Sequence, residues 1–127
     1  MNEPRPTVAI IGASGKPNRY SYKSYKAHAA CGYEVYLVNP RGGEIEDRRV
    51  YATIDEIPPT NLNRVTMYVS PAIGGTLLEA IARKGCEELW FNPGSESDEL
   101  VERARALGLN PVVACSLVDC QSRPQRD

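Results

Sequence analysis

The chain has 127 residues, a length typical of one domain and too short for two independent cores. Hydrophobic residues make up 42% and charged residues 24%, and the formal net charge is −1. No overall positive field would therefore hold nucleic acid or an anionic membrane, and no apolar run approaches the roughly 20 residues that span a bilayer.

The cysteines and the N-terminus bear on cellular location and on metals. Four cysteines stand without a CxxC pair, and the chain has a single histidine, so a structural zinc site is not expected. The first six residues are polar and carry proline, unlike a signal segment. Unpaired cysteines without such a segment predict a cytoplasmic protein.

In the first half of the chain, short β-branched runs alternate with helical patterns, as in sheets built from βαβ units. Residues 7–11 form a continuously apolar strand, and residues 21–31 a helix that Gly32 ends. A second strand covers 34–38. The charged stretch 44–50 is interpreted as a surface excursion.

The second half continues the alternation. After a short helical turn at 53–56, a third strand covers 64–69 and ends at Ser70-Pro71, a common helix start. That helix stops at Gly85. A fourth strand at 88–91, an amphipathic helix around 100–107 and a fifth strand at 110–114 follow.

This order of elements predicts one Rossmann-like α/β domain that spans residues 1–127. Right-handed crossovers would arrange a five-stranded parallel sheet in the order 3-2-1-4-5, with helices on both faces. The ordered core is expected to cover residues 7–116, and a polar tail the residues after 120.

Candidate site residues follow the strands. Parallel strands end at one edge of the sheet, where the next helices present unpaired N–H groups that attract phosphate. Small, polar or proline residues are also simply what loops contain, but four such loops at one edge favour a binding site. The four loops are Gly12-Ala13-Ser14, Asn39-Pro40-Arg41, Ser70-Pro71 and Asn92-Pro93-Gly94.

The type of nucleotide can be narrowed from these loops. A dinucleotide fingerprint needs glycine at positions 12, 14 and 17 and an acidic residue after the second strand. The chain has Ser14 and Pro17 instead, and Arg41 after the second strand. Arginine there suits a phosphate on the ribose, as in NADP or coenzyme A (CoA), and disfavours NAD. A P-loop motif is absent from the sequence.

Over roughly residues 7–116 the sequence resembles the small CoA-binding domain family, whose fold is shared with the N-terminal domain of the succinyl-CoA synthetase alpha subunit. Cys115 also fits the pattern of that family, whereas Asn92 stands where its stand-alone members often have glutamine. The matching stretches are residues 8–14, 17–20, 32–40, 68–71 and 89–94.

This resemblance implies how the ligand would lie across the strand ends. The turn at 12–14, together with Lys16, Asn18, Arg19 and Tyr20, would cradle the pyrophosphate of CoA. Residues 39–41 would meet the adenosine and its 3′-phosphate. Ser70, Pro71 and residues 92–94 would line the opposite wall.

Two residues invite chemical interpretations. His28 lies inside the first helix without a partner at catalytic or ligand spacing, so it is interpreted as a packed or solvated helix residue. Cys115 follows the fifth strand, where it could meet the CoA thiol or be an inert small residue.

No nucleophile with its base, carboxylate pair or metal set is visible in the sequence. The first hypothesis is therefore a non-catalytic module that binds CoA or acyl-CoA as a small-molecule ligand. The alternatives are a fragment of an NADP-dependent oxidoreductase and an interaction domain that has lost its ligand. The protein partner stays open.

Overall fold

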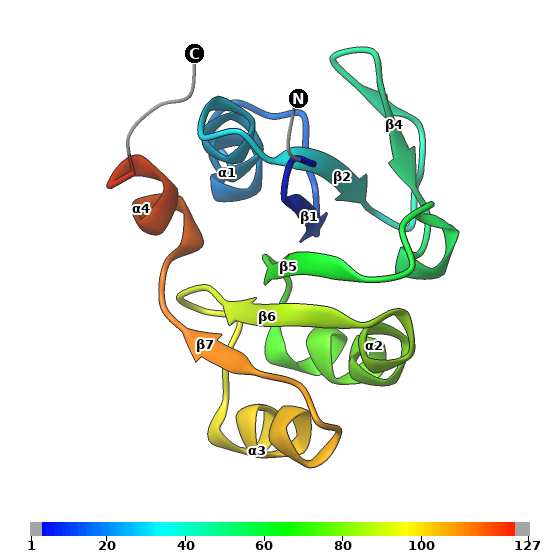
Figure 1. The fold of residues 1–127 in the computed structure, drawn as a ribbon, viewed down its shortest axis with the longest axis vertical. Coiled ribbons are helices and arrows are strands. Elements are labelled where there is room, and N and C mark those ends of the chain that lie inside the picture. Colours follow the sequence, from blue (N-terminus) through cyan, green and yellow to red (C-terminus); the bar gives the residue numbers. More distant parts are fainter. Residues whose placement is uncertain (1–3, 124–127) are drawn as a thin grey trace.

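A twisted sheet forms the centre of the computed structural model, which describes residues 4–123 (Figure 1). Its seven strands lie in the order β3-β4-β2-β1-β5-β6-β7. All neighbours are parallel except β3 and β4, which form an antiparallel hairpin. The strands are β1 (Thr7–Ile11), β2 (Glu34–Val38), β3 (Glu44–Ile45), β4 (Arg48–Tyr51), β5 (Leu62–Met67), β6 (Cys86–Phe91) and β7 (Pro111–Val113).

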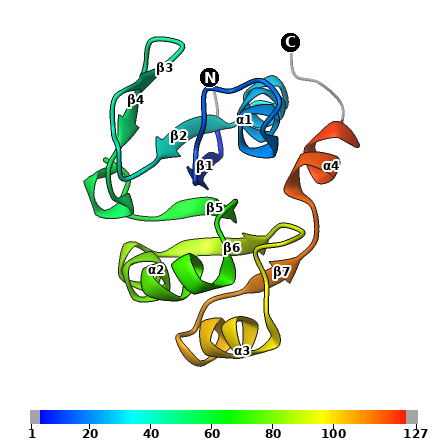
Figure 2. The same ribbon diagram turned by 180° about the vertical axis from the view of Figure 1, so that it is seen from behind.

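Helices cover both faces of the sheet, as the sequence predicted (Figures 1 and 2). The residues of β1 show why, because they alternate between two buried clusters. Ala9 and Ile11 pack with α2 (Pro71–Lys84) and α3 (Asp98–Ala106) on one face. Val8 and Ile10 pack with α1 (Tyr20–Ala30) on the other.

The prediction of five strands in the order 3-2-1-4-5 is wrong, because the sheet contains two further strands, β3 and β4. The missed strand β4 is the reason for the different order. β4 pairs in parallel with β2, with Leu37 opposite Val50, and so occupies the edge of β2 assigned to the third predicted strand. That third strand is β5, which instead pairs with the other side of β1. The stretch 44–50 is therefore not a loose excursion, since it forms β3 and most of β4.

The helix ends follow the sequence signals closely. The Ser70 hydroxyl accepts a hydrogen bond from the N–H of Ile73 at 3.4 Å, and Gly85 ends α2 with a φ of +88°. A short 3-10 turn, η1 (Ile54–Glu56), lies where a helical turn was predicted. The N-terminal position of proline and the left-handed glycine are the local causes of the α2 boundaries.

A further helix, α4 (Ser116–Gln121), follows β7 and packs against α1. The folded part therefore extends beyond residue 116, at which the sequence analysis ended the core. Cys120 of α4 is fully buried among the residues of the α1 face. The predicted tail continues to residue 127, and its residues 124–127 lie outside the described part of the chain.

Candidate functional site

A cleft of about 1470 Å³ runs along the carboxyl ends of the central strands. It exceeds the 300–1,000 Å³ typical of small-molecule pockets, which suits a long ligand. Pro40 and Pro71 are not among the residues that line it. The other thirteen predicted site residues do line it: Gly12, Ala13, Ser14, Lys16, Asn18, Arg19, Tyr20, Asn39, Arg41, Ser70, Asn92, Pro93 and Gly94.

The turn after β1 requires glycine. Gly12 has a φ of +88°, and a Cβ there would lie 2.7 Å from the carbonyl oxygen of Tyr68. The N–H groups of Gly12 and Ala13 both donate to the carbonyl of Val38 at 3.0 Å. The backbone that follows β1 therefore packs tightly between the ends of β2 and β5. A side chain at position 12 would push these two strands apart.

The loop after β2 is held by Asn39. Its side-chain Nδ2 donates to the carbonyl of Ala13 at 3.0 Å, and its Oδ1 accepts from the N–H of Arg41 at 2.9 Å. Asn39 thus joins the first two loops of the cleft and fixes the backbone at Arg41. The side chain of Arg41 remains exposed on the rim.

The β3–β4 hairpin forms a wall of the cleft that the sequence analysis did not foresee. Ile45 and Val50 line the cleft from this wall. At the hairpin tip, the Glu46 carboxylate accepts hydrogen bonds from Lys26 at 2.8 Å, from Tyr25 at 3.3 Å and from Tyr22. These hydrogen bonds, that from Lys26 first, lower the pKa of Glu46.

The loop after β6 is braced by Asn92, which is only 2% exposed. Its Nδ2 donates to Thr66 Oγ1 at 2.6 Å and to the carbonyl of Met67 at 2.8 Å. Its Oδ1 accepts from the N–H of Ser116 at 2.8 Å and from the Ser116 hydroxyl at 2.9 Å. The side chain predicted to contact a ligand therefore holds the start of α4 against the sheet, and Pro93 and Gly94 form the exposed rim.

The far wall of the cleft comes from α4. Leu117, Val118 and Gln121 line it together with Cys115, which directly precedes the helix. Cys115 was a candidate from the sequence, whereas the three helical residues were not. The sequence signal for this helix is short. Leu117 and Cys120 stand at helical spacing, but a single turn of apolar residues is not enough to distinguish a helix from an irregular tail.

The charged side chains that line the cleft all have one sign. Lys16, Arg19 and Arg41 line it, and no aspartate or glutamate is among its described lining residues. The first turn of α1 opens onto it through Tyr20 and Ser21, without a side-chain cap and without an acidic residue. Such a helix end attracts anions, so this region is locally positive in a chain of net charge −1.

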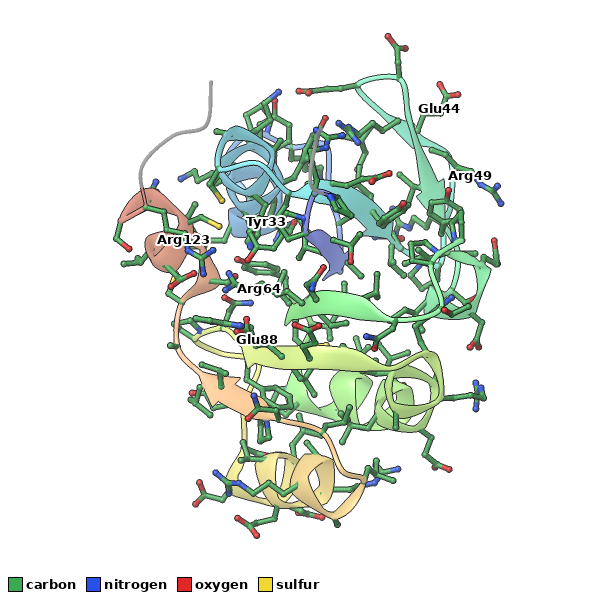
Figure 3. All side chains as sticks on the ribbon, viewed as in Figure 1. Tyr33, Glu44, Arg49, Arg64, Glu88 and Arg123 are labelled. Carbon is green, nitrogen blue, oxygen red and sulfur yellow. The ribbon has the colours of Figure 1, made fainter. Side chains whose placement is uncertain are left out.

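A second polar cluster is built around Arg64, which is only 1% exposed. Its guanidinium lies 3.1 Å from Glu88 and 3.1 Å from Asp119, and it stacks on Trp90 with its carbon 4.3 Å from the ring centroid. In Figure 3, Arg64 lies near Tyr33, whereas the hairpin lies well apart from both. Two carboxylates and an aromatic face compensate the buried charge, which explains an arginine within a central strand.

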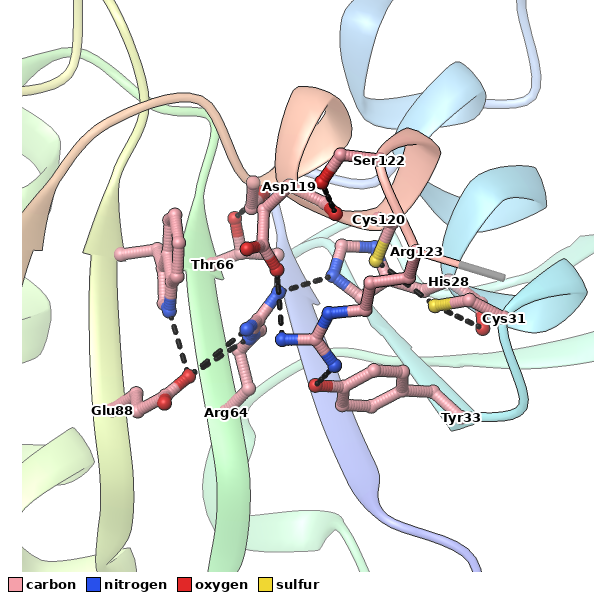
Figure 4. Close-up of polar contacts among 12 residues, drawn as sticks. His28, Cys31, Tyr33, Arg64, Thr66, Glu88, Asp119, Cys120, Ser122 and Arg123 are labelled. Atoms are coloured by element: carbon pink, nitrogen blue, oxygen red, sulfur yellow. Dashed lines mark hydrogen bonds and ion pairs between the residues drawn. The ribbon is translucent and has the colours of Figure 1, made fainter. Parts of the chain in front are cut away.

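His28 belongs to this second cluster and does not line the cleft (Figure 4). Its side chain is fully buried, as one of the two sequence interpretations proposed, with Nδ1 2.8 Å from the carbonyl of Ser24 and Nε2 3.4 Å from Arg64. Nδ1 must carry the proton to satisfy that carbonyl, which leaves Nε2 as the acceptor facing Arg64. Burial lowers the pKa of His28 to about 4, and the positive charge of Arg64 acts in the same direction.

Residues 4–123 contain neither a cluster of metal-ligating side chains nor a membrane-spanning helix. No three His, Cys, Asp or Glu side chains within this range are grouped closely enough to hold a metal ion. None of the helices described there has the length and apolarity needed to cross a bilayer.

The parallel sheet, the glycine turn after β1 and the cationic cleft at the strand ends define a Rossmann-like domain with a site suited to anions. Comparison with known proteins makes the assignment specific. The model of the CoA binding domain family matches residues 6–121, and the chain belongs to this family. The resemblance inferred from the sequence is thereby confirmed.

Individual relatives agree with this assignment. The alpha subunit of acetate–CoA ligase (ADP-forming) I from Pyrococcus furiosus is 33% identical, over 81% of this chain and 26% of its own length. This chain therefore spans about a quarter of that curated relative. A conserved hypothetical protein from the same organism is 29% identical, with a TM-score of 0.80 over 90% of this chain and 98% of its own. A hypothetical protein from Pyrococcus horikoshii is also 29% identical, with a TM-score of 0.83 over 92% of this chain and 82% of its own.

Proposed function

We propose that this domain binds CoA or an acyl-CoA in the cleft and does not itself catalyse a reaction. The observation that carries the proposal is the set of three cations, Lys16, Arg19 and Arg41, around a cleft whose described lining has no carboxylate. CoA carries a pyrophosphate and a ribose phosphate, so its binding requires positive groups at two separate points. Arg41 lies on the loop after β2, and the other two cations lie on the loop that leads to α1.

The layout of the cleft suggests an orientation for the ligand. The pyrophosphate would lie against the turn at 12–14 and the uncapped start of α1, where N–H groups and the helix dipole favour negative charge. Arg41 would meet the ribose 3′-phosphate. The apolar side chains of Ile45 and Val50 offer a surface for adenine, and the pantetheine arm would extend toward α4 and Cys115.

The non-catalytic part of the proposal rests on the chemistry available in the cleft. His28, a common general base in enzymes, is buried beside Arg64 and is not a lining residue. The acetate–CoA ligase subunit is about four times as long as the matched region, which covers 26% of it. A domain of this kind would bind the nucleotide and present its thiol or thioester to a partner protein or domain.

Ligand selectivity tests the proposal. A ligand at 100 times its dissociation constant adds about 2.7 kcal/mol of stability. CoA should therefore raise the Tm more than NADP, NAD or ATP at equal concentration, and CoA should co-purify with the protein. Equal shifts with all four nucleotides would reject CoA as the ligand, and a larger shift with NADP would favour the oxidoreductase alternative.

The orientation is tested by Arg41→Ala together with dephospho-CoA, which lacks the 3′-phosphate. A charge-assisted hydrogen bond to a phosphate contributes about 1.5–3 kcal/mol, so the variant should bind CoA roughly ten- to a hundredfold more weakly. Its affinity for dephospho-CoA should hardly change. Arg49→Ala is a matched control, because Arg49 is an exposed hairpin arginine that does not line the cleft. Equal losses for both ligands would contradict the proposed orientation.

A further inference from the structure

Two cysteines that are 89 positions apart in the sequence meet between α1 and α4. The sulfur atoms of Cys31 and Cys120 lie 3.1 Å apart, and both residues are buried free thiols. Cys31 is the C-cap residue of α1, and Cys120 lies in α4. Figure 4 shows the two sulfur atoms facing each other beside His28 and Arg123.

The other two cysteines are placed differently. Cys86 starts β6 and packs against the buried cluster on the opposite face of the sheet. Cys115 is partly exposed and lines the cleft. Among the four cysteines, the pair of Cys31 and Cys120 is thus the one whose sulfur atoms are already in contact.

We propose that Cys31 and Cys120 are a redox-active dithiol whose reversible disulfide tethers α4 to α1. With hydrogen peroxide as the oxidant, the Cys31 thiol is oxidised to a sulfenic acid, and one water is released. The Cys120 sulfur then attacks the Cys31 sulfur, the S–S bond forms, and the sulfenic oxygen leaves with a proton as a second water. Two small thiols restore the pair by exchange and are themselves oxidised to a disulfide.

The environment of each thiol assigns its part in the reaction. Burial raises the pKa of the Cys120 thiol to about 12, with the Cys31 thiol as a further cause. Cys31 is 7% exposed, whereas Cys120 has no exposed surface. Cys31 is therefore the thiol that meets the oxidant, and Cys120 is the resolving thiol that waits beside it.

The tether matters because α4 forms a wall of the cleft. Leu117, Val118 and Gln121 line the cleft from this helix, whose start is held by hydrogen bonds between Ser116 and Asn92. A disulfide at Cys120 would fix the other end of the same helix. The effect on ligand release rests on the proposed function, whereas formation of the disulfide does not.

The first experiment treats the whole protein with hydrogen peroxide and analyses its non-reduced peptides by mass spectrometry. The expected product is one cross-linked pair of peptides that contain Cys31 and Cys120, with a loss of two hydrogen atoms that dithiothreitol reverses. The oxidised form should have a Tm higher by about 10 °C, because the cross-link closes a long loop of the unfolded chain. Cys31→Ala and Cys120→Ala should each abolish the cross-link and the Tm gain, and the control Cys86→Ala should retain both.

The second experiment measures CoA dissociation from the reduced and the oxidised protein. Slower CoA release from the oxidised form would support the proposal that the disulfide holds α4 in place as a wall of the cleft. Equal release rates would overturn this effect on the ligand. Pairing of Cys31 with another cysteine, or separate oxidation of the two thiols to sulfinic acids, overturns the dithiol itself. Failure of both forms to bind CoA rejects the proposed function, and the peptide analysis still decides on the disulfide.

Discussion

Acid should destabilise this domain through His28. The side chain is fully buried, its Nδ1 proton is used by the Ser24 carbonyl, and its Nε2 faces Arg64 at 3.4 Å. A second proton on the ring would therefore lie against the Arg64 guanidinium. Burial is the main cause of the low pKa of His28, about 4, and the charges of Arg64 and Arg123 contribute to it, whereas the hydrogen bond to the Ser24 carbonyl and the charge of Asp119 act in the opposite direction.

The sign and size of the effect follow from linkage. The pKa of His28 rises to its ordinary value of 6.5 on unfolding, so between pH 6.5 and 4 the unfolded chain binds a proton that the folded chain does not. The stabilisation is complete above pH 6.5, is lost as the pH falls, and stays lost below pH 4. The gap between the two pKa values corresponds to about 3 kcal/mol of unfolding free energy.

Urea unfolding at several pH values between 7 and 4 would measure this loss in the wild type and in His28→Gln. The carboxyl groups titrate in both proteins, so the difference between their pH profiles isolates the histidine. Because the chain has a single histidine, NMR can also follow its titration without assignment. Parallel pH profiles for the two proteins, or an NMR pKa near 6.5, would show that His28 does not cause the acid destabilisation.

Three further predictions concern the walls of the cleft. Asn92→Ala should lower the unfolding free energy by about 2–4 kcal/mol, because it removes four buried hydrogen bonds and leaves the buried N–H of Ser116 without a partner; a loss below about 1 kcal/mol in urea unfolding would contradict the role of Asn92 as a brace. Glu46→Ala should speed the exchange of backbone amide hydrogens in the hairpin, because it removes the hydrogen bonds that join the hairpin tip to α1. Glu46→Gln should speed this exchange less, because its side-chain carbonyl still accepts from Lys26. Equal exchange rates in both variants would contradict a stabilising role of these hydrogen bonds. Oxidised CoA should form a mixed disulfide with Cys115, seen as one added CoA mass that dithiothreitol removes, and attachment at another cysteine would disprove the proposed path of the pantetheine arm.

The elements that the sequence predicted well are those with a local cause. The apolar run at 7–11 is the buried central strand β1, and Ser70-Pro71 and Gly85 mark the two ends of α2. The convergence of the four loops at one edge also followed, because parallel strands dictate it. These features depend on neighbours in sequence or on a rule that holds for every such sheet.

The hairpin could not be predicted from the same signals. Arg48 and Arg49 are exposed and charged, and Val50 is the one buried residue of β4. The turn places Glu46 and Asp47 at φ values of +52° and +67°, where hairpins usually carry glycine or asparagine. Because the sequence has neither a turn signal nor an alternating apolar pattern here, β4 was not predicted. The predicted order of the sheet was wrong as a result.

Arg64 shows a different limit of sequence reasoning. A charged residue in a strand is ordinarily placed toward solvent, yet Arg64 is among the most deeply buried side chains of the described residues. Its partners Glu88 and Asp119 come from β6 and α4, which are distant in sequence. Only the assembled fold brings these charges together, so no local pattern identifies them.

The residues at the cleft are of two kinds, those whose side chains bond to other parts of the protein and those whose side chains are exposed. The side chains of Asn39 and Asn92 make their hydrogen bonds to other parts of the protein, and so they set the shape of the cleft and the position of its walls. Lys16, Arg19 and Arg41 are exposed on its rim, where a bound phosphate would order them. Substitution of either asparagine should therefore lower stability in the absence of ligand as well as affinity, whereas substitution of a rim cation should lower affinity alone. A rim variant that lost as much unfolding free energy as Asn92→Ala would show that this division is wrong.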